Sequence, residues 1–182
     1  MNFIWKMIKS PSFRSKTSGS ISIRLKKEIF EDRNALTGNQ IIDFVKKFKK
    51  KKKIYTFILS DLENLPLSIP KNCYFLINVT KNENKGVHWI VIKNLKGRII
   101  MFDSFDLSTR ILPKPWSEVV VKSDDCVFQN KESTVCGQYC ALFILEEKLM
   151  SIFKCTSPNS KKSVKNDVLC LYMFQKLNKI LQ

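Results

Sequence analysis

The segment "CGQYCALFILEEKLMSIF", residues 136–153, is the part of the sequence that most constrains the fold. Its pattern predicts a long helix, and the first half of that helix is apolar on nearly every side. Such a helix cannot lie on a surface with one face in water, because its hydrophobic side chains point in all directions. We therefore expect it to be central and covered on all sides by other elements.

The segments ahead of this helix are rich in β-branched and aromatic residues and predict strands. Two of them flank the turn "NLKG", whose Gly97 can take a positive φ angle, so we expect these two to form a β-hairpin. The expected strands cover residues 54–59, 73–79, 87–94, 98–105, 118–121 and 126–129. Two more helices are expected, one entering the lysine run at 49–53 and one from about residue 164 to the end. This mixture predicts an α+β fold in which the buried helix packs on a mixed β-sheet.

The chain has 182 residues, enough for one sizeable core and too few for two ordinary domains. Residues 1–35 mix serine, lysine and proline, and we expect a loosely ordered basic extension there, with one domain over residues 36–182. Lysines interrupt the apolar run at the amino terminus, and no later apolar stretch approaches the length that crosses a bilayer. The sequence thus predicts a soluble intracellular monomer without a membrane partner.

Six cysteines occur without a secretory signal, so we expect reduced thiols rather than a disulfide framework, most of them acting as small core hydrophobes. They are Cys73, Cys126, Cys136, Cys140, Cys155 and Cys170. The sequence has no CxxC pair and only one histidine, whereas zinc sites usually draw on paired cysteines or several histidines. We therefore expect no metal.

The formal net charge of +16 concerns partners and solubility rather than the fold. Its densest part is the run Lys49, Lys50, Lys51, Lys52 and Lys53. Such a run is typical of a surface that binds nucleic acid or another polyanion, and equally of a solvated face that keeps a protein soluble.

One set of residues has the types that a cysteine hydrolase needs: a thiolate, a base, a group that orients the base, and donors for an oxyanion. Cys136 is expected at the first turn of the buried helix, where the helix dipole and free N–H groups lower a thiol pKa. Gly137 next to it would let a substrate carbonyl come close to the backbone. His88 is the only imidazole in the chain and so the only conventional base. The alternative is that Cys136 is one more packed thiol.

The hairpin decides which acid can orient His88. A two-residue or a four-residue loop places Asp103 on the face of His88, whereas a three-residue loop places Asp106 there. Gln129, seven residues before Cys136, can point amide N–H groups at an oxyanion together with the backbone N–H of Cys136.

The order "GVHW", "MFDSF" and a Gln separated by six residues from "CGQYCALF" resembles the adenain family, the maturation proteases of adenoviruses and related DNA viruses and virophages. The match covers roughly residues 72–145. The related sumo-specific proteases usually have five residues between Gln and Cys and an Asp directly before the Cys-Gly pair. Here six residues intervene and Val135 precedes Cys136, which favours the adenain side.

The resemblance implies a papain-like α+β fold and a role for each of these residues. His88 would be the base, Asp103 its orienter where adenain has Glu, Gln129 part of the oxyanion hole and Cys136 the nucleophile. Trp89 would wall the substrate site, unless it is plain core packing. Cys140 resembles a non-catalytic cysteine of the family and is expected in the core.

The function implied is that of a viral cysteine endopeptidase that cleaves capsid or core precursor proteins after small sites, Gly-Gly or Gly-Xaa. It would act in the virion and the infected cell without a metal or organic cofactor. Because adenovirus proteases use viral DNA as a cofactor, the resemblance also favours non-specific DNA binding by the lysine run. The alternatives are a deubiquitinating or sumo-removing protease and a non-enzymatic DNA-binding protein on a dead protease fold.

Overall fold

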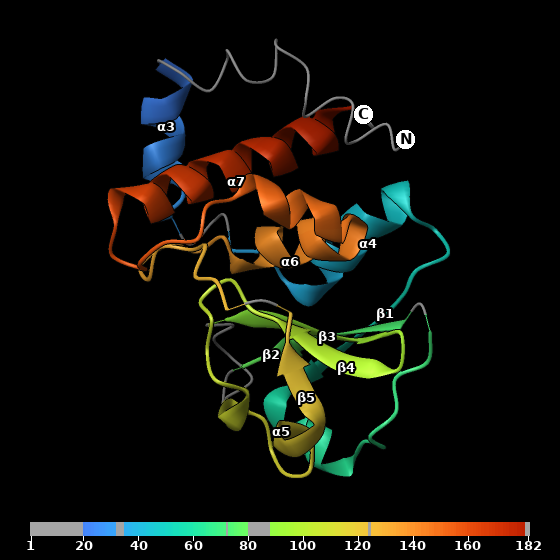
Figure 1. Ribbon diagram of the computed structural model, residues 1–182. Helices are drawn as coiled ribbons and strands as arrows, with labels where there is room; N and C mark the ends of the chain where they lie inside the picture. The colour runs from blue at the N-terminus through green and yellow to red at the C-terminus, as the bar shows by residue number, and fades with distance from the viewer. Residues whose placement is uncertain (1–19, 32–34, 72, 80–87, 124, 181–182) are drawn as a thin grey trace.

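The computed structural model describes residues 20–31, 35–71, 73–79, 88–123 and 125–180. It is a mixed α and β structure, as the sequence predicts, in which the main helices cover one face of a five-stranded sheet (Figure 1). One hydrophobic core lies between that face and the helices, and a second, smaller core lies under the opposite face. The central strands of the sheet are therefore buried on both sides, which explains their nearly continuous apolar residues.

The strands are arranged in the order β1-β2-β3-β4-β5. The β2, β3 and β4 strands are antiparallel, whereas β1 runs parallel to β2 and β5 parallel to β4. Their bounds are β1 Lys53–Ile58, β2 Cys73–Asn78, β3 Trp89–Leu95, β4 Arg98–Phe102 and β5 Val120–Lys122. All five strands overlap strands that the sequence predicts. The segment 126–129 is also predicted as a strand but is not one. Its backbone does not pair with a neighbouring strand; instead, the N–H groups of Phe128 and Gln129 both donate to the Ser104 carbonyl, in the turn after β4.

The hairpin between β3 and β4 has the two-residue turn, one of the loop lengths that the sequence left open. Leu95 pairs with Arg98, and the two residues between them both have positive φ, 53° at Lys96 and 88° at Gly97. These angles define a turn whose twist matches that of the two strands, and glycine adopts them without steric cost. The register that follows fixes which side chains share a face of the sheet.

The buried helix is α6, Cys136–Leu145, and every one of its ten residues is buried. It is shorter than predicted, since Glu146 has extended angles (φ −161°, ψ 103°) and a 3-10 turn, η4 Glu147–Ile152, follows. The sequence explains the stop: a helix surrounded by apolar side chains cannot continue through two glutamates and a lysine. Glu147 instead forms an ion pair with Lys93 at the sheet.

Helices α4 and α7 pack on α6, and α3 packs on α7 (Figure 1). Their bounds are α3 Ser20–Glu28, α4 Gly38–Phe48 and α7 Lys161–Lys179. The amino end of α4 is fixed by a capping box between Thr37 and Gln40. On the far face of the sheet lie η2 Leu59–Asn64, η3 Thr109–Ile111 and α5 Trp116–Val119. No helix within the described ranges has the length and hydrophobicity needed to cross a bilayer.

The extension expected over residues 1–35 lies partly outside the described residues. Where it is described, it packs on the core instead of being loosely attached: Leu25 and Ile29 are buried, and the Ile29 carbonyl accepts from the backbone N–H of Thr134 (2.9 Å). The predicted boundary between the extension and the domain, after residue 35, stays a prediction.

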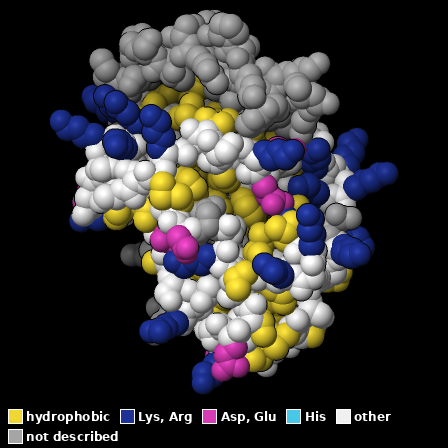
Figure 2. All heavy atoms as spheres, in the orientation of Figure 1, with side chains coloured by type: hydrophobic (Ala, Val, Ile, Leu, Met, Phe, Trp, Pro, Cys, Tyr) yellow, Lys and Arg dark blue, Asp and Glu magenta, His cyan; other side chains and the backbone are white. Residues whose placement is uncertain are grey.

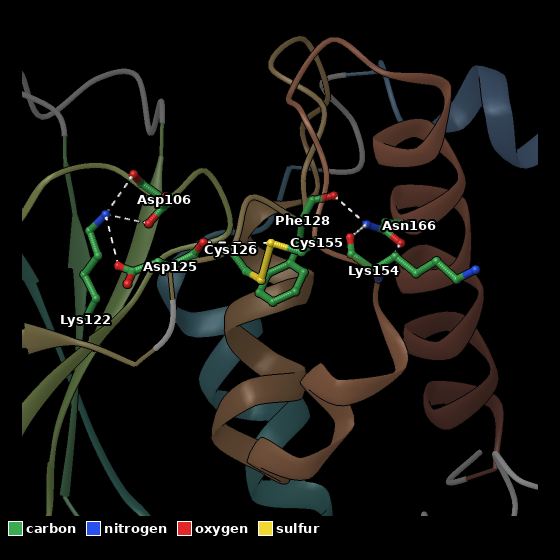
Figure 3. The surroundings of a disulfide bond; sticks show 8 residues. All are labelled: Asp106, Lys122, Asp125, Cys126, Phe128, Lys154, Cys155 and Asn166. Carbon is green, nitrogen blue, oxygen red and sulfur yellow. Dashed lines mark hydrogen bonds and ion pairs between the residues drawn. A yellow bond between two sulfur atoms is a disulfide. The ribbon is translucent and has the colours of Figure 1, made fainter.

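The cysteines differ from prediction in one respect. Cys73, Cys136, Cys140 and Cys170 are free and buried, but Cys126 and Cys155 form a disulfide (Figure 3). The two lie 29 residues apart in sequence and their Cα atoms are 5.0 Å apart, within the span that a disulfide bridges. The sequence contains no pattern that predicts this pairing, because only the tertiary fold brings the two loop cysteines together.

This pairing predicts that the denatured protein has four thiols before reduction and six after it. Because the bond closes a long loop, reduction should lower the free energy of unfolding by about 3 kcal/mol. Mass spectrometry after alkylation, and denaturant unfolding with and without reductant, measure the two effects. Cys155→Ser is the control, since reduction should leave its stability unchanged. Six thiols in the unreduced protein would contradict the pairing.

Candidate active site

His88 and Asp103 lie next to each other at the ends of adjacent antiparallel strands. Val91 pairs with Phe102, so His88, just before β3, and Asp103, just after β4, lie diagonally opposite on one face. His88 Nε2 is 2.6 Å from Asp103 Oδ1, and both side chains are buried. The ring of Phe105 packs against the imidazole, with ring centroids 4.5 Å apart.

Backbone groups fix the Asp103 carboxylate in this position. The N–H of Phe105 donates to Oδ1 (2.8 Å) and the N–H of Leu107 to Oδ2 (2.9 Å). These bonds satisfy a buried charge and aim it at the imidazole. A carboxylate held in this way can fix the tautomer of a histidine and stabilise its protonated form.

Asp106, the other acid that the sequence left open, points elsewhere. It takes a positive φ of 59°, and its carboxylate forms an ion pair with Lys122 at 2.6 Å (Figure 3). Of the two acids, the structure brings only Asp103 into contact with His88.

Cys136 is the first residue of α6 and is buried, with 6% of its surface exposed. The thiol interacts with the His88 ring. Burial alone lowers the pKa of His88, but hydrogen bonds and charge interactions with Asp103 and Cys136 outweigh burial and raise the pKa to about 9. Nδ1 of the ring is buried and makes no hydrogen bond in the described part of the chain, so it is the ring nitrogen that is free to take up a proton from Cys136. The His88 ring thus has a carboxylate bonded to one nitrogen and interacts with the Cys136 thiol.

Gln129 lies where predicted, in the buried segment ahead of α6, but its donors point away from a substrate. Its Nε2 donates to the carbonyl (2.9 Å) and the hydroxyl (3.0 Å) of Ser133, and its Oε1 accepts from the Ser104 hydroxyl (2.6 Å). The carbonyl can only accept, so the amide orientation is fixed. In this arrangement the donors left for an oxyanion are the backbone N–H groups of the first turn of α6.

Gly137 has a packing role in the structure. A Cβ added there would lie 3.0 Å from Leu36 Cβ and 3.2 Å from Ile41 Cδ1. The glycine therefore lets α4 and the segment before it approach α6, and the predicted substrate contact at Gly137 stays a prediction.

Trp89, the residue after His88, lines a groove. Its indole N–H donates to the Leu36 carbonyl (2.8 Å), which fixes the ring, and the groove has a volume of about 340 Å³. The lining residues are Thr37, Gly38, Asn39, Thr56, Phe57, Ile58, Asp61, Asn78 and Trp89. Neither His88 nor Cys136 lines this groove, so the role of Trp89 as the wall of a substrate site stays a prediction.

Cys140, one turn beyond Cys136, is fully buried, as predicted. Its thiol donates to the Trp89 carbonyl (3.2 Å), and burial raises its pKa well above the ordinary value. A neutral thiol enclosed in the core is not a nucleophile.

Sequence reasoning missed a group of buried polar residues around Gln129: Ser104, Ser133, Asn130, Asp167, Asn166 and Ser163. The last three lie on the buried face of α7. A signal for them exists in the sequence, because polar residues at positions 163, 166 and 167 share a helical face with the apolar Cys170.

The lysine run does not behave as one surface. Lys50, Lys51 and Lys53 are exposed, but the Lys52 ammonium points inward, where it binds the Tyr74 hydroxyl (2.9 Å) and the Ile144 carbonyl at the end of α6. Burial, followed by the positive charge of Lys93, lowers the Lys52 pKa to about 8. Lys52 therefore stabilises the fold and does not fit the predicted DNA contact. Basic side chains outnumber acidic ones on the face drawn in Figure 2.

In the described residues no group of three histidine, cysteine or carboxylate side chains gathers as a metal ion requires. Comparison with protein-family models and with curated proteins finds no match to this chain.

The His88–Asp103 pair makes stability depend on pH. The pKa of His88 is raised from 6.5 to about 9, so protonated His88 contributes stability that is complete below about pH 6.5 and is lost as the pH rises through about 9. The loss is on the order of 3 kcal/mol. Asp103→Asn should remove a large part of it, because Asp103 supplies two of the four interactions that favour the charged ring. Denaturant unfolding at several pH values measures the difference.

Asp106→Asn is the matched control, since Asp106 pairs with a lysine outside this site. It should keep the wild-type dependence on pH. Identical pH dependence in wild type and Asp103→Asn would show that Asp103 does not hold a proton on His88.

Proposed function

We propose that this protein is a cysteine endopeptidase with a papain-like architecture of the adenain type. The observation that carries the proposal is the position of the single imidazole. His88 is hydrogen-bonded to a fixed carboxylate on one side and interacts on the other with a thiol at the start of a buried helix. These are the three positions that nucleophile, base and orienter occupy in a cysteine hydrolase.

In the reaction, Asp103 keeps Nε2 of His88 protonated and so directs Nδ1 toward Cys136. The proton of the Cys136 thiol resides on Nδ1, which makes His88 an imidazolium, and the Cys136 thiolate attacks the peptide carbonyl. The oxyanion is stabilised by backbone N–H groups at the start of α6, with Gln129 contributing once its amide turns away from Ser133. His88 protonates the leaving amine as the C–N bond breaks and leaves a thioester. Water, deprotonated by His88, then releases the new carboxylate and the thiol.

For the substrate, the resemblance supports capsid or core precursor proteins cut after Gly-Gly or Gly-Xaa during virion maturation in the infected cell. The groove beside Trp89 would receive the chain that leads to the scissile bond. No metal or organic cofactor takes part in these steps. The competing enzyme class removes ubiquitin-like proteins, and incubation with ubiquitin-like fusions and with the capsid precursor separates the two.

The catalytic assignment predicts different effects for two cysteines on one helix. Cys136→Ala should abolish cleavage of a fluorogenic Gly-Gly peptide and leave the melting temperature nearly unchanged, because it removes only a sulfur at the helix start. Cys140→Ala should retain most activity and lose stability, since it leaves a small cavity in the core. Equal loss of activity in both variants would mean that packing, not chemistry, explains Cys136.

The basic surface supports a second activity, non-specific DNA binding that stimulates cleavage. Lys50, Lys51 and Lys53 are exposed together beside α4. Changing these three to Gln should weaken binding to unrelated duplexes and reduce the log–log salt slope by up to about 2.7, about 0.9 for each phosphate contact. Fluorescence anisotropy over a salt series measures the slope.

The matched control removes the same charge elsewhere, with Lys161, Lys162 and Lys165 of α7 changed to Gln. It should leave the slope closer to that of the wild type. Equal effects of the two triple variants would assign the affinity to net charge alone, and no binding at low salt would leave the run as a solubility feature. Retained binding together with an inert Cys136 would favour the non-enzymatic alternative.

A further inference from the structure

Asp167 on α7 is a fully buried carboxyl group that the proposed reaction does not use. None of its surface is exposed, and no ion pair within the described residues involves it. A buried carboxyl without a cation costs folding free energy, so its partners have to compensate for lost hydration. Burial raises its pKa to about 7, although hydrogen bonds from Asn130, Ser133 and Tyr139 lower it. The titratable groups that face it are Tyr139 on α6 and Cys170 on α7.

The two carboxyl oxygens bind the two segments that build the candidate active site. Oδ2 accepts from the backbone N–H of Asn130 (2.9 Å), the residue after Gln129. Oδ1 accepts from the hydroxyl of Tyr139 (3.0 Å), which lies on α6 one turn beyond Cys136. A single side chain therefore fixes the segment that carries Gln129 relative to the helix that carries the nucleophile.

The hydrogen-bond network extends to the turn that carries Asp103, the residue that orients His88. Ser133, which interacts with Asp167, accepts both bonds from the Gln129 amide, and the Ser104 hydroxyl donates to Gln129 Oε1 (2.6 Å). Ser104 follows Asp103 directly in sequence. Hydrogen bonds thus run from the turn of the triad acid through Gln129 to Asp167 and on to α6. Such a buried network holds one arrangement only when every member is satisfied.

The neighbouring residue on α7 anchors the same segment. The Asn166 amide donates to the Phe128 carbonyl (3.0 Å) and to the Lys154 carbonyl (2.8 Å), as Figure 3 shows. The Ser163 hydroxyl accepts from the Asn130 side chain (3.2 Å). Asn166 and Ser163 tie this segment to α7, but of these side chains only Asp167 also reaches α6.

We propose that Asp167 is a positioning residue for the candidate active site: its carboxyl group holds the Gln129 segment and the start of α6 in one relative placement, which keeps the backbone N–H groups of the first turn of α6 in position for the oxyanion. This rests on the proposed peptidase function. Asp167 touches neither the substrate nor the reacting atoms and acts through Asn130 and Tyr139.

Positioning can be separated from plain stabilisation because two reactions of Cys136 make different demands. Hydrolysis of a peptide forms an oxyanion and needs the donors in place. Alkylation of Cys136 by iodoacetamide forms no oxyanion and needs only the pair with His88. That pair is held independently, since the Cys140 thiol ties α6 to the Trp89 carbonyl beside His88.

The experiment measures both reactions in four variants, using a fluorogenic Gly-Gly peptide and iodoacetamide. Asp167→Ala removes both bonds, and Tyr139→Phe removes only the bond to α6. Asp167→Asn keeps the shape, accepts from Asn130 and can donate to the Tyr139 oxygen. Leu171→Ala, a buried change on the same helix outside the network, is the control for lost packing.

We expect kcat to fall about tenfold or more in Asp167→Ala and less in Tyr139→Phe, because displacing an oxyanion donor costs part of the about 10²-fold loss seen on its removal. KM and the rate of Cys136 alkylation should stay within about twofold of wild type, a change that is small compared with the expected fall in kcat. Asp167→Asn should recover most of kcat. Leu171→Ala should lower the melting temperature and leave kcat unchanged.

Wild-type kcat in both Asp167→Ala and Tyr139→Phe would overturn the positioning role. So would an equal fall of hydrolysis and alkylation in them, which would indicate general loss of structure. If Asp167→Ala does not fold, Tyr139→Phe decides, because it keeps the carboxyl group. A wild-type protein whose Cys136 is alkylated rapidly but which hydrolyses no Gly-Gly peptide would overturn the proposed function, and this inference with it.

Discussion

Burial of α6 on all sides is the constraint on which the rest of the structure depends. Its ten residues have almost no polar face, so the sheet has to cover one side and α4 and α7 the others. The helix also has to begin close to the sheet, because its first residue, Cys136, interacts with His88 beside β3. Because α6 is buried against the sheet, the Cys136 thiol at its start lies next to the only imidazole of the chain.

Burial also strengthens the electrostatic interactions between the side chains of the site. The His88 and Asp103 side chains are almost completely removed from water, and the carboxylate is held by two backbone N–H groups. In such surroundings an unpaired charge is costly and a paired one is strongly bound. Loss of water alone would discharge the imidazole, and its partners keep it protonated instead. The proposed mechanism uses this protonated imidazole beside Cys136.

The sequence predicts the parts of the fold that follow from short-range patterns. The turn at Lys96 and Gly97 sets the parity of the hairpin, and that parity alone separates Asp103 from Asp106. The first turn of α6 is predicted because an all-apolar helix has a clear start in the sequence.

What the sequence does not predict depends on contacts between distant segments. The Cys126–Cys155 bond, the inward position of Lys52 and the orientation of the Gln129 amide are set by neighbours far away in the chain. The end of α6 was misjudged because the polar residues after Leu145 still fit a helical pattern, and their ion pair at the sheet was not visible. Gln129 in particular shows that a residue can lie where a motif puts it and still direct its donors elsewhere.

The central claim is that Cys136 and His88 act together as a nucleophile toward a peptide carbonyl. Its most direct test is the covalent capture of the protein by a peptide ending in Gly-Gly that carries a vinyl ester in place of the scissile bond. Digestion and mass spectrometry then locate the adduct. We expect one adduct, on Cys136, that forms with the wild type and not with His88→Ala. An adduct on another cysteine, or equal labelling of the two proteins, would contradict the assignment.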